Sequence, residues 1–244
     1  MTNKLNQFTI HNSLLTKILS ILAPQCPSAF TLAETLIVMG IIGVVAALTL
    51  PNLNSSTGNK EKVAKVKKIY SNLNDAYGRA VAVYGEYDDW FNNDTADDAK
   101  NKRAAERLTE FMKISKDCAQ NTTGCVTGSD TKKVYDIDGS SYSMRNTKSY
   151  NYLLADGTSL MIRYNEILFD IDGPNKGLHR MRNDIYGVYI SSSNGGIYVG
   201  SADSVDGCVN HADIKQCTAW VVQNDNMDFL KCPSTLNATV TSCK

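Results

Sequence analysis

The sequence predicts an α+β fold, in which a long N-terminal helix packs on an antiparallel β-sheet and a disulfide-bearing C-terminal tail follows. Three observations lead to this prediction. An apolar run at residues 30–51 continues into an amphipathic segment that ends at residue 84, as expected for one helix with two kinds of surface. Beyond residue 130 the apolar period changes from that of a helix to that of a strand. Six of the seven cysteines follow the helix.

The apolar run reads FTLAETLIVMGIIGVVAALTLP and is predicted to cross the hydrocarbon core of a bilayer. Glu34 is its one charged residue, and a carboxylate within a membrane segment suggests a function. Residues 1–29 contain Lys4 and Lys17 and no acidic residue. Because basic residues before a span favour an inside amino terminus, we expect the rest of the chain outside the cytoplasm.

Residues 29–51, AFTLAETLIVMGIIGVVAALTLP, resemble the N-terminal cleavage and methylation motif of type IV prepilins and type II secretion pseudopilins. The resemblance implies that residues 1–29 form a leader, which prepilin peptidase removes between Ala29 and Phe30. It also implies that the new amino terminus at Phe30 is N-methylated, and that the fold is pilin-like. Other readings of the leader, as a signal peptide or a lipoprotein signal at Cys26, fit the residues less well.

Cleavage after Ala29 would give Phe30 a free amino group one helical turn from Glu34. We expect Glu34 to act in subunit assembly, where it would pair with the amine of a neighbouring subunit inside the apolar core. Gly43 and Ala47 lie one turn apart and either permit close helix packing or reflect ordinary membrane-helix composition.

The function expected from the resemblance is that of a structural subunit in a type IV pilus-like or type II secretion pseudopilus filament. The chain would start in the inner (cytoplasmic) membrane as a single-pass protein with its N-terminus inside, and then enter a periplasmic or cell-surface filament. Its partners would be prepilin peptidase, other pilin or pseudopilin subunits, the inner-membrane assembly platform and the membrane. The alternative is a single-pass membrane-anchored extracytoplasmic binding module or minor tip adhesin, which would keep residues 1–29.

Residues 52–84 are predicted to continue the helix beyond Pro51. Proline removes an amide donor from the helix, so a kink is expected at this residue. Residues 52–59 are polar and read either as a linker or as a strained part of the helix; we favour a kinked continuation. From residue 60 onward, apolar residues recur at helical spacing and predict a stripe that needs a sheet to cover it: Val63, Val66, Ile69, Tyr70, Leu73, Tyr77, Ala80, Val81 and Tyr84.

Residues 85–244 are predicted to form a soluble α+β domain. Residues 85–101 are acidic and polar, which indicates a solvated loop. A second helix is expected from about Asp97 to Ser115. Short segments with period two then predict an antiparallel meander, with turns at Asp156-Gly157 and at residues 194–196. A short helix within residues 217–232 is expected to pack against the sheet through Trp220, Met227 and Leu230.

Six cysteines beyond the apolar run suggest disulfides in an oxidising compartment. They allow 15 connectivities, and the sequence does not select one of them. The most local scheme pairs Cys118–Cys125, Cys208–Cys217 and Cys232–Cys243.

Composition and motifs give no reason to expect an enzyme, a cofactor or a nucleic-acid partner. The 25 basic and 25 acidic residues balance, whereas a nucleic-acid surface needs a basic excess. The turns Asp136-Ile-Asp138-Gly139 and Asp170-Ile-Asp172-Gly173 either gather oxygen ligands for calcium or simply turn the chain. His179 and His211 lack the spacing of a zinc site, and no nucleophile motif accompanies Cys217 and His211.

Overall fold

The structure, a computed structural model, describes residues 31–121, 123–126, 134–136, 139–142, 148–177, 179–200, 205–209 and 213–243. The expected cleavage site at Ala29 and Phe30 lies outside the described residues, as do Asp138 and His211. The chain divides into two compact units, Met1–Leu53 and Asn54–Lys244.

Helix α2 (Leu32–Tyr84) contributes residues to both units. Its backbone is helical through Pro51 and residues 52–59, so the linker reading of that segment is wrong. The kink expected at Pro51 stays a prediction. Within the described part of the chain, no helix combines the length and the apolar character that crossing a membrane would require. The span expected over residues 30–51 therefore also stays a prediction.

The main sheet of the second unit is antiparallel throughout and has the strand order β1-β4-β5-β6-β7-β8. The expected meander is confirmed for the last five of these strands. A separate two-stranded sheet pairs β2 (Val134–Tyr135) with β3 (Ser141–Tyr142). The strands of the main sheet are β1 (Ile114–Ala119), β4 (Tyr150–Leu154), β5 (Ser159–Ile162), β6 (Glu166–Asp170), β7 (Ile185–Ser191) and β8 (Gly196–Tyr198).

Two predicted turns connect neighbouring strands of this sheet. Between β4 and β5, the Gly157 amide donates to the Leu154 carbonyl at 3.0 Å. Gly157 has a φ of +90°, which glycine adopts more readily than residues with a side chain. Between β7 and β8, the short helix η2 (Ser192–Asn194) is followed by Gly195 in the left-handed region.

The segment after α2 differs from the prediction at two places. Helix η1 (Tyr87–Phe91) forms where part of the solvated loop was expected. The segment is not solvated throughout, because the Tyr87 and Trp90 side chains are only 3% and 2% exposed. Helix α3 (Asp97–Thr109) ends before the expected Ser115. Residues 114–119 instead form β1 at the sheet edge, where pairing with β4 satisfies backbone groups that a longer helix would have used.

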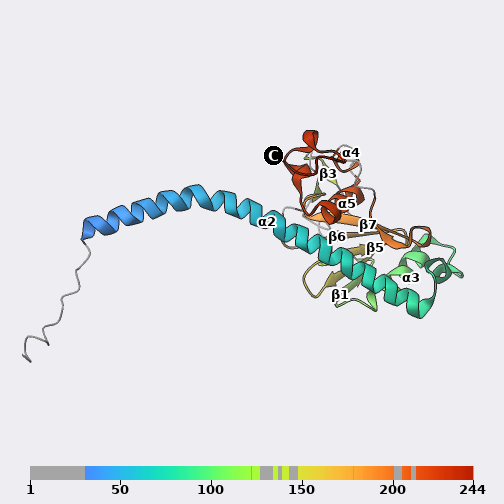
Figure 1. Ribbon diagram of the computed structural model, residues 1–244. Helices are drawn as coiled ribbons and strands as arrows, with labels where there is room; N and C mark the ends of the chain where they lie inside the picture. The colour runs from blue at the N-terminus through green and yellow to red at the C-terminus, as the bar shows by residue number, and fades with distance from the viewer. Residues whose placement is uncertain are drawn as a thin grey trace, which may run out of the picture. The chain divides into compact units, whose positions relative to one another are not determined.

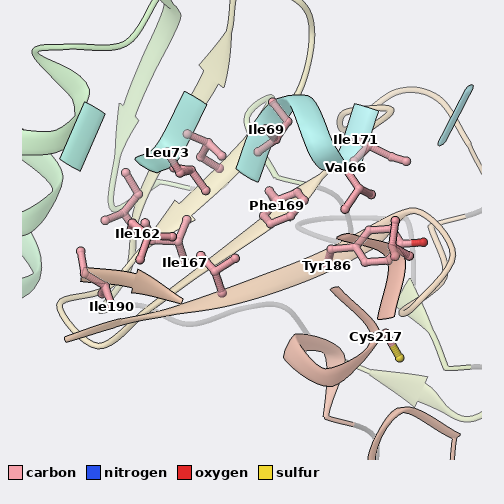
Figure 2. Close-up of a cluster of buried hydrophobic side chains, with 14 of the residues drawn as sticks. Val66, Ile69, Leu73, Ile162, Ile167, Phe169, Ile171, Tyr186, Ile190 and Cys217 are labelled. Carbon is pink, nitrogen blue, oxygen red and sulfur yellow. The ribbon is translucent and has the colours of Figure 1, made fainter. Parts of the chain in front are cut away.

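The core lies between the C-terminal part of α2 and one face of the sheet. Figure 2 shows Val66, Ile69 and Leu73 of α2 above Phe169 of β6 and Ile162 of β5. The predicted stripe is therefore confirmed: its members Val66, Ile69, Leu73 and Ala80 are at most 1% exposed. Successive strand residues point to opposite faces, and a second buried cluster covers the other face: Met161, Leu168, Met181, Ile185 and Ile214.

The C-terminal tail packs on β7 through α5 (Ile214–Asn224), and Figure 1 shows this helix beside the sheet. Ile214 comes so close to β7 that a Cβ atom at Gly187 would lie 3.1 Å from its Cδ1 atom. Trp220 and Met227 are each 1% exposed, as expected, and Leu230 is half-buried. The remaining tail elements are α4 (Val205–Val209), η3 (Asp228–Leu230) and η4 (Pro233–Thr235).

Three disulfides are present, and they join the cysteines of the most local scheme. Cys118–Cys125 joins β1 to the segment that follows it; Cys125 belongs to the second buried cluster, and Cys118 packs against it. Cys208–Cys217 ties α4 to α5 and is almost fully buried. Cys232–Cys243 fastens the last residues to the end of η3.

Candidate functional site

The first turn of α2 is closed by two reciprocal hydrogen bonds between Thr31 and Glu34. The Thr31 amide donates to Oε2 of Glu34 at 2.9 Å, and the Glu34 amide donates to the Thr31 hydroxyl oxygen at 3.2 Å. The Thr31 hydroxyl also donates to Oε2 at 2.9 Å. This is a capping box, which satisfies two of the amide groups that a helix start leaves unpaired. The Glu34 side chain is thus fixed by its own helix.

Both bonds to the Glu34 carboxylate use the same oxygen. Among the described residues, Oε1 of Glu34 accepts no hydrogen bond, and the residue is exposed. A carboxylate has about four lone-pair sites, so this group can accept a second donor without losing the capping box. A cationic donor would form the stronger, charge-assisted kind of bond.

The residues around Glu34, from Leu32 to Val45, present apolar side chains on every side of the helix. Most of the exposed large apolar residues in the described chain belong to this one segment. Contiguous exposed apolar area on a soluble monomer is normally limited, so a surface of this kind marks a site of interaction with a protein or a membrane. The residues concerned are Leu32, Leu36, Ile37, Val38, Met39, Ile41, Ile42, Val44 and Val45, each at least 52% exposed.

The second half of α2 is held to its own unit by ion pairs as well as by its apolar stripe. The Lys62 ammonium lies 2.6 Å from the Asp184 carboxylate, whose side chain is fully buried, and 3.0 Å from the Asn183 side-chain oxygen. Lys65 pairs with Asp172 at 2.7 Å, and this hydrogen bond raises the pKa of the lysine. This half of the helix is therefore committed to the globular unit, whereas the described apolar side chains of the first half are exposed.

The carboxylates considered for calcium already have partners within the protein. Asp170 accepts the amides of Asp172 and Gly173 at 3.0 and 3.1 Å, as a turn-forming aspartate does. Asp136 pairs with Arg182. In the described residues, no three carboxylate, histidine or cysteine side chains gather in a way that would hold a metal ion. Both Asp-x-Asp-Gly segments are thus accounted for as turns wherever they are described.

Of the pair considered for nucleophilic chemistry, Cys217 is described and His211 lies outside the described residues. Cys217 is bonded to Cys208, so it has no free thiol. His179 lies near Asp170, with 3.6 Å between Nδ1 and Oδ2, and is buried.

Thr31 is the hydrogen-bond partner of Glu34 that the sequence-based prediction did not name. Its signal was present in the sequence, since Thr31-Leu-Ala-Glu34 before an apolar run is the pattern of a capping box.

Comparison of the chain with protein-family models, with curated proteins and with solved structures found no match. A function therefore has to be proposed from the residues of the helix start, the apolar surface and the globular unit.

Proposed function

We propose that the chain is a structural subunit of a type IV pilus-like or type II secretion pseudopilus filament. One observation carries the proposal: a single helix places a capped, exposed Glu34 at its start, an apolar surface after it and a buried amphipathic half at its end. The last half fixes the helix to a globular unit, which leaves the first half to pack with other apolar helices. This division of one helix into two environments is the pilin-like plan.

Maturation would begin at the leader. Lys4 and Lys17 keep residues 1–29 on the cytoplasmic side, and prepilin peptidase cuts between Ala29 and Phe30. The new amino group of Phe30 is then methylated, which keeps its positive charge. Residues 30–51 hold the subunit in the inner membrane until the assembly platform transfers it into the filament. The cysteine-bearing unit stays on the oxidising side, in agreement with its three disulfides.

The pairing of Glu34 with an amine would select for correct assembly. In the apolar core of a filament, a carboxylate and an ammonium group each carry a large desolvation penalty unless they meet. Oε1 of Glu34 can accept the amine of a neighbouring Phe30, while Oε2 keeps the bonds to Thr31. The axial register of the subunits would then be set by this pair.

Two glycines support close packing along the same segment. A Cβ atom at Gly40 or Gly43 would meet nothing within 4 Å, so the fold of the described chain does not require glycine there. Glycine in a helix interior costs about 1 kcal/mol relative to alanine, which argues for another reason to keep it. Small residues let two helices approach closely in an apolar phase.

The decisive experiment follows Glu34→Ala through cleavage and assembly. We expect normal removal of the leader and loss of the subunit from sheared filaments, because an unpaired amine in the core opposes assembly. Leu36→Ala is the matched control, since it shortens a neighbouring exposed side chain without removing charge. Equal incorporation of Glu34→Ala and wild-type subunits would refute the pairing role of Glu34.

A further inference from the structure

A cleft of about 440 Å³ opens on the second unit, between η1, the turn from β5 to β6, and strands β7 and β8. Its volume falls within the range of sites that bind small molecules. Aromatic rings dominate its lining, so we refer to it as the aromatic cleft: they belong to Tyr87, Phe91, Tyr164, Tyr189 and Tyr198.

The rings of the aromatic cleft are held in place by one another and by hydrogen bonds. The Tyr87 and Phe91 rings meet edge to face at 5.0 Å, and Phe91 meets Tyr164 in the same manner at 6.1 Å. Tyr189 and Tyr198 are stacked across β7 and β8 with ring centroids 5.2 Å apart. The Tyr189 hydroxyl donates to Asp213 at 3.2 Å. A ligand would thus meet a preformed surface, which lowers the entropy lost on binding.

Polar groups stand between these rings. The Asn165 side-chain amide lines the cleft and makes no hydrogen bond with any described residue. The Lys100 ammonium lies 5.4 Å from the Tyr164 ring centroid, and no described carboxylate is within ion-pair distance of it. Asp88 and Ser191 add a carboxylate and a hydroxyl to the lining. Asp88 also accepts the Ser192 hydroxyl, and the Ser191 hydroxyl pairs with that of Ser193 at 2.8 Å, so the lining combines one positive and one negative charge with neutral polar groups.

We propose that the aromatic cleft binds a neutral pyranose glycan. A pyranose ring has an apolar face of C–H groups, which stacks on a tyrosine ring, and a rim of hydroxyls that both donate and accept hydrogen bonds. Tyr198 would supply a ring surface, and Asn165 would supply paired donor and acceptor atoms to vicinal hydroxyls. The volume accommodates a short stretch of such a chain.

Charged ligands fit the same lining less well. A quaternary ammonium ligand would be repelled by two cations at the rings, because the Lys100 ammonium lies 5.4 Å from the Tyr164 ring centroid and the Lys215 ammonium lies 4.7 Å from that of Tyr189. A nucleic acid would need a basic surface along its backbone, whereas the cleft carries Asp88 beside Lys100. A neutral ligand meets neither obstacle.

Glycan binding goes beyond the filament proposal and does not depend on it, because the aromatic cleft lies wholly within the second unit. A filament built from such subunits would be adhesive toward sugar-coated surfaces. If the chain instead stays a membrane-anchored module, the same site would serve it.

The test uses the full chain in a phosphocholine detergent, which carries no sugar. The probes are soluble tetramers of glucose and of N-acetylglucosamine, and a proline-rich peptide is included because aromatic grooves also bind such peptides. Saturation-transfer NMR detects contact, and calorimetry gives the dissociation constant. We expect at least one tetrasaccharide to bind, and Tyr198→Ala to weaken it about tenfold through loss of a stacking face.

Asn165→Ala is the second variant, chosen because its side chain supports no hydrogen bond of the fold, and it is expected to weaken binding several-fold. Tyr135→Ala is the matched control, since that ring is 40% exposed and lies outside the cleft. Failure of both tetrasaccharides to bind, or binding of the peptide alone, would overturn the proposal. Unchanged sugar affinity in folded Tyr198→Ala and Asn165→Ala would do so too.

Discussion

The Thr31 amide lies 2.9 Å from Oε2 of Glu34, so the charged residue of the apolar segment is bound by the residue that begins the helix. Replacing Thr31 with alanine removes the hydroxyl that accepts the Glu34 amide. Loss of an N-cap side chain typically costs about 0.5–2 kcal/mol. We therefore expect the Glu34 amide hydrogen of Thr31→Ala to exchange about 2–30 times faster in micelles.

Thr35→Ala is the control for this measurement. The Thr35 hydroxyl donates to the Leu32 carbonyl at 2.9 Å and takes no part in the capping box. Exchange at the Glu34 amide should stay at the wild-type rate in this variant. Equal exchange in Thr31→Ala and wild type would mean that the capping box does not hold the helix start.

The packing of α2 on the sheet predicts a large difference between two truncations on the same helix. Leu73 is fully buried, whereas Val83 is 60% exposed. Leu73→Ala should lower the free energy of unfolding by about 2–5 kcal/mol, because the core around it cannot fully close the cavity. Val83→Ala should change it by about 0.5 kcal/mol or less. Chemical denaturation followed by tryptophan fluorescence measures both, and similar small values would contradict the packing of this half on the sheet.

The lysines of α2 should differ in their contributions to stability. Lys62 pairs with a fully buried carboxylate, while Lys68 and Asp156 form a pair that is 58% and 33% exposed. Lys62→Met should destabilise the protein by about 2–3 kcal/mol, because Asp184 loses a cationic partner in a buried place. Lys68→Met should cost under about 1 kcal/mol. Chemical denaturation in low and high salt measures the free energy of unfolding of both variants. Equal decreases in Lys62→Met and Lys68→Met would contradict the claim that burial of Asp184 makes the Lys62 pair the stronger one.

Alkaline pH should unfold the protein partly through its buried tyrosines. Burial, with the negative charge of Asp117 as a smaller cause, raises the pKa of Tyr152 to about 12 from an ordinary value of 10.0. The folded state therefore favours the neutral phenol, so the stability that this residue contributes is complete below pH 10 and is lost as pH rises toward 12. Tyr152→Phe should unfold at higher pH than wild type.

The matched variant for this titration is Tyr135→Phe, which changes a ring that is 40% exposed. Its alkaline unfolding midpoint should equal that of wild type, measured by circular dichroism. A Tyr152→Phe midpoint that does not move would show that ionisation of Tyr152 is not linked to unfolding.

Regular patterns made much of the fold predictable from the sequence. The stripe from Val63 to Tyr84 follows from burial of one helix face, and the short apolar runs in β5 and β6 follow from burial of both sheet faces. The turn at Asp156-Gly157 was predictable because a tight hairpin turn requires a positive φ, which Gly157 has in the structure. Local disulfides were one scheme among many, and the sequence alone could not choose between them.

The parts that escaped prediction depend on partners distant in the sequence. Strand β1 has little apolar alternation, and it is a strand because β4 lies beside it. The acidic segment at η1 looked solvated, yet Trp90 packs among tyrosines and donates to the Gly85 carbonyl at 2.9 Å. The aromatic cleft likewise gathers Tyr87, Tyr164 and Tyr198 from separate stretches of chain.

The central claim, that this chain is processed as a filament subunit, is tested most directly by mass spectrometry of its mature amino terminus. Protein isolated from the native membrane should begin at Phe30 and carry one methyl group on its α-amine. The anchored binding module would instead keep residues 1–29. Detection of a chain that begins at Met1, or of an unmethylated terminus at another position, would contradict the proposal.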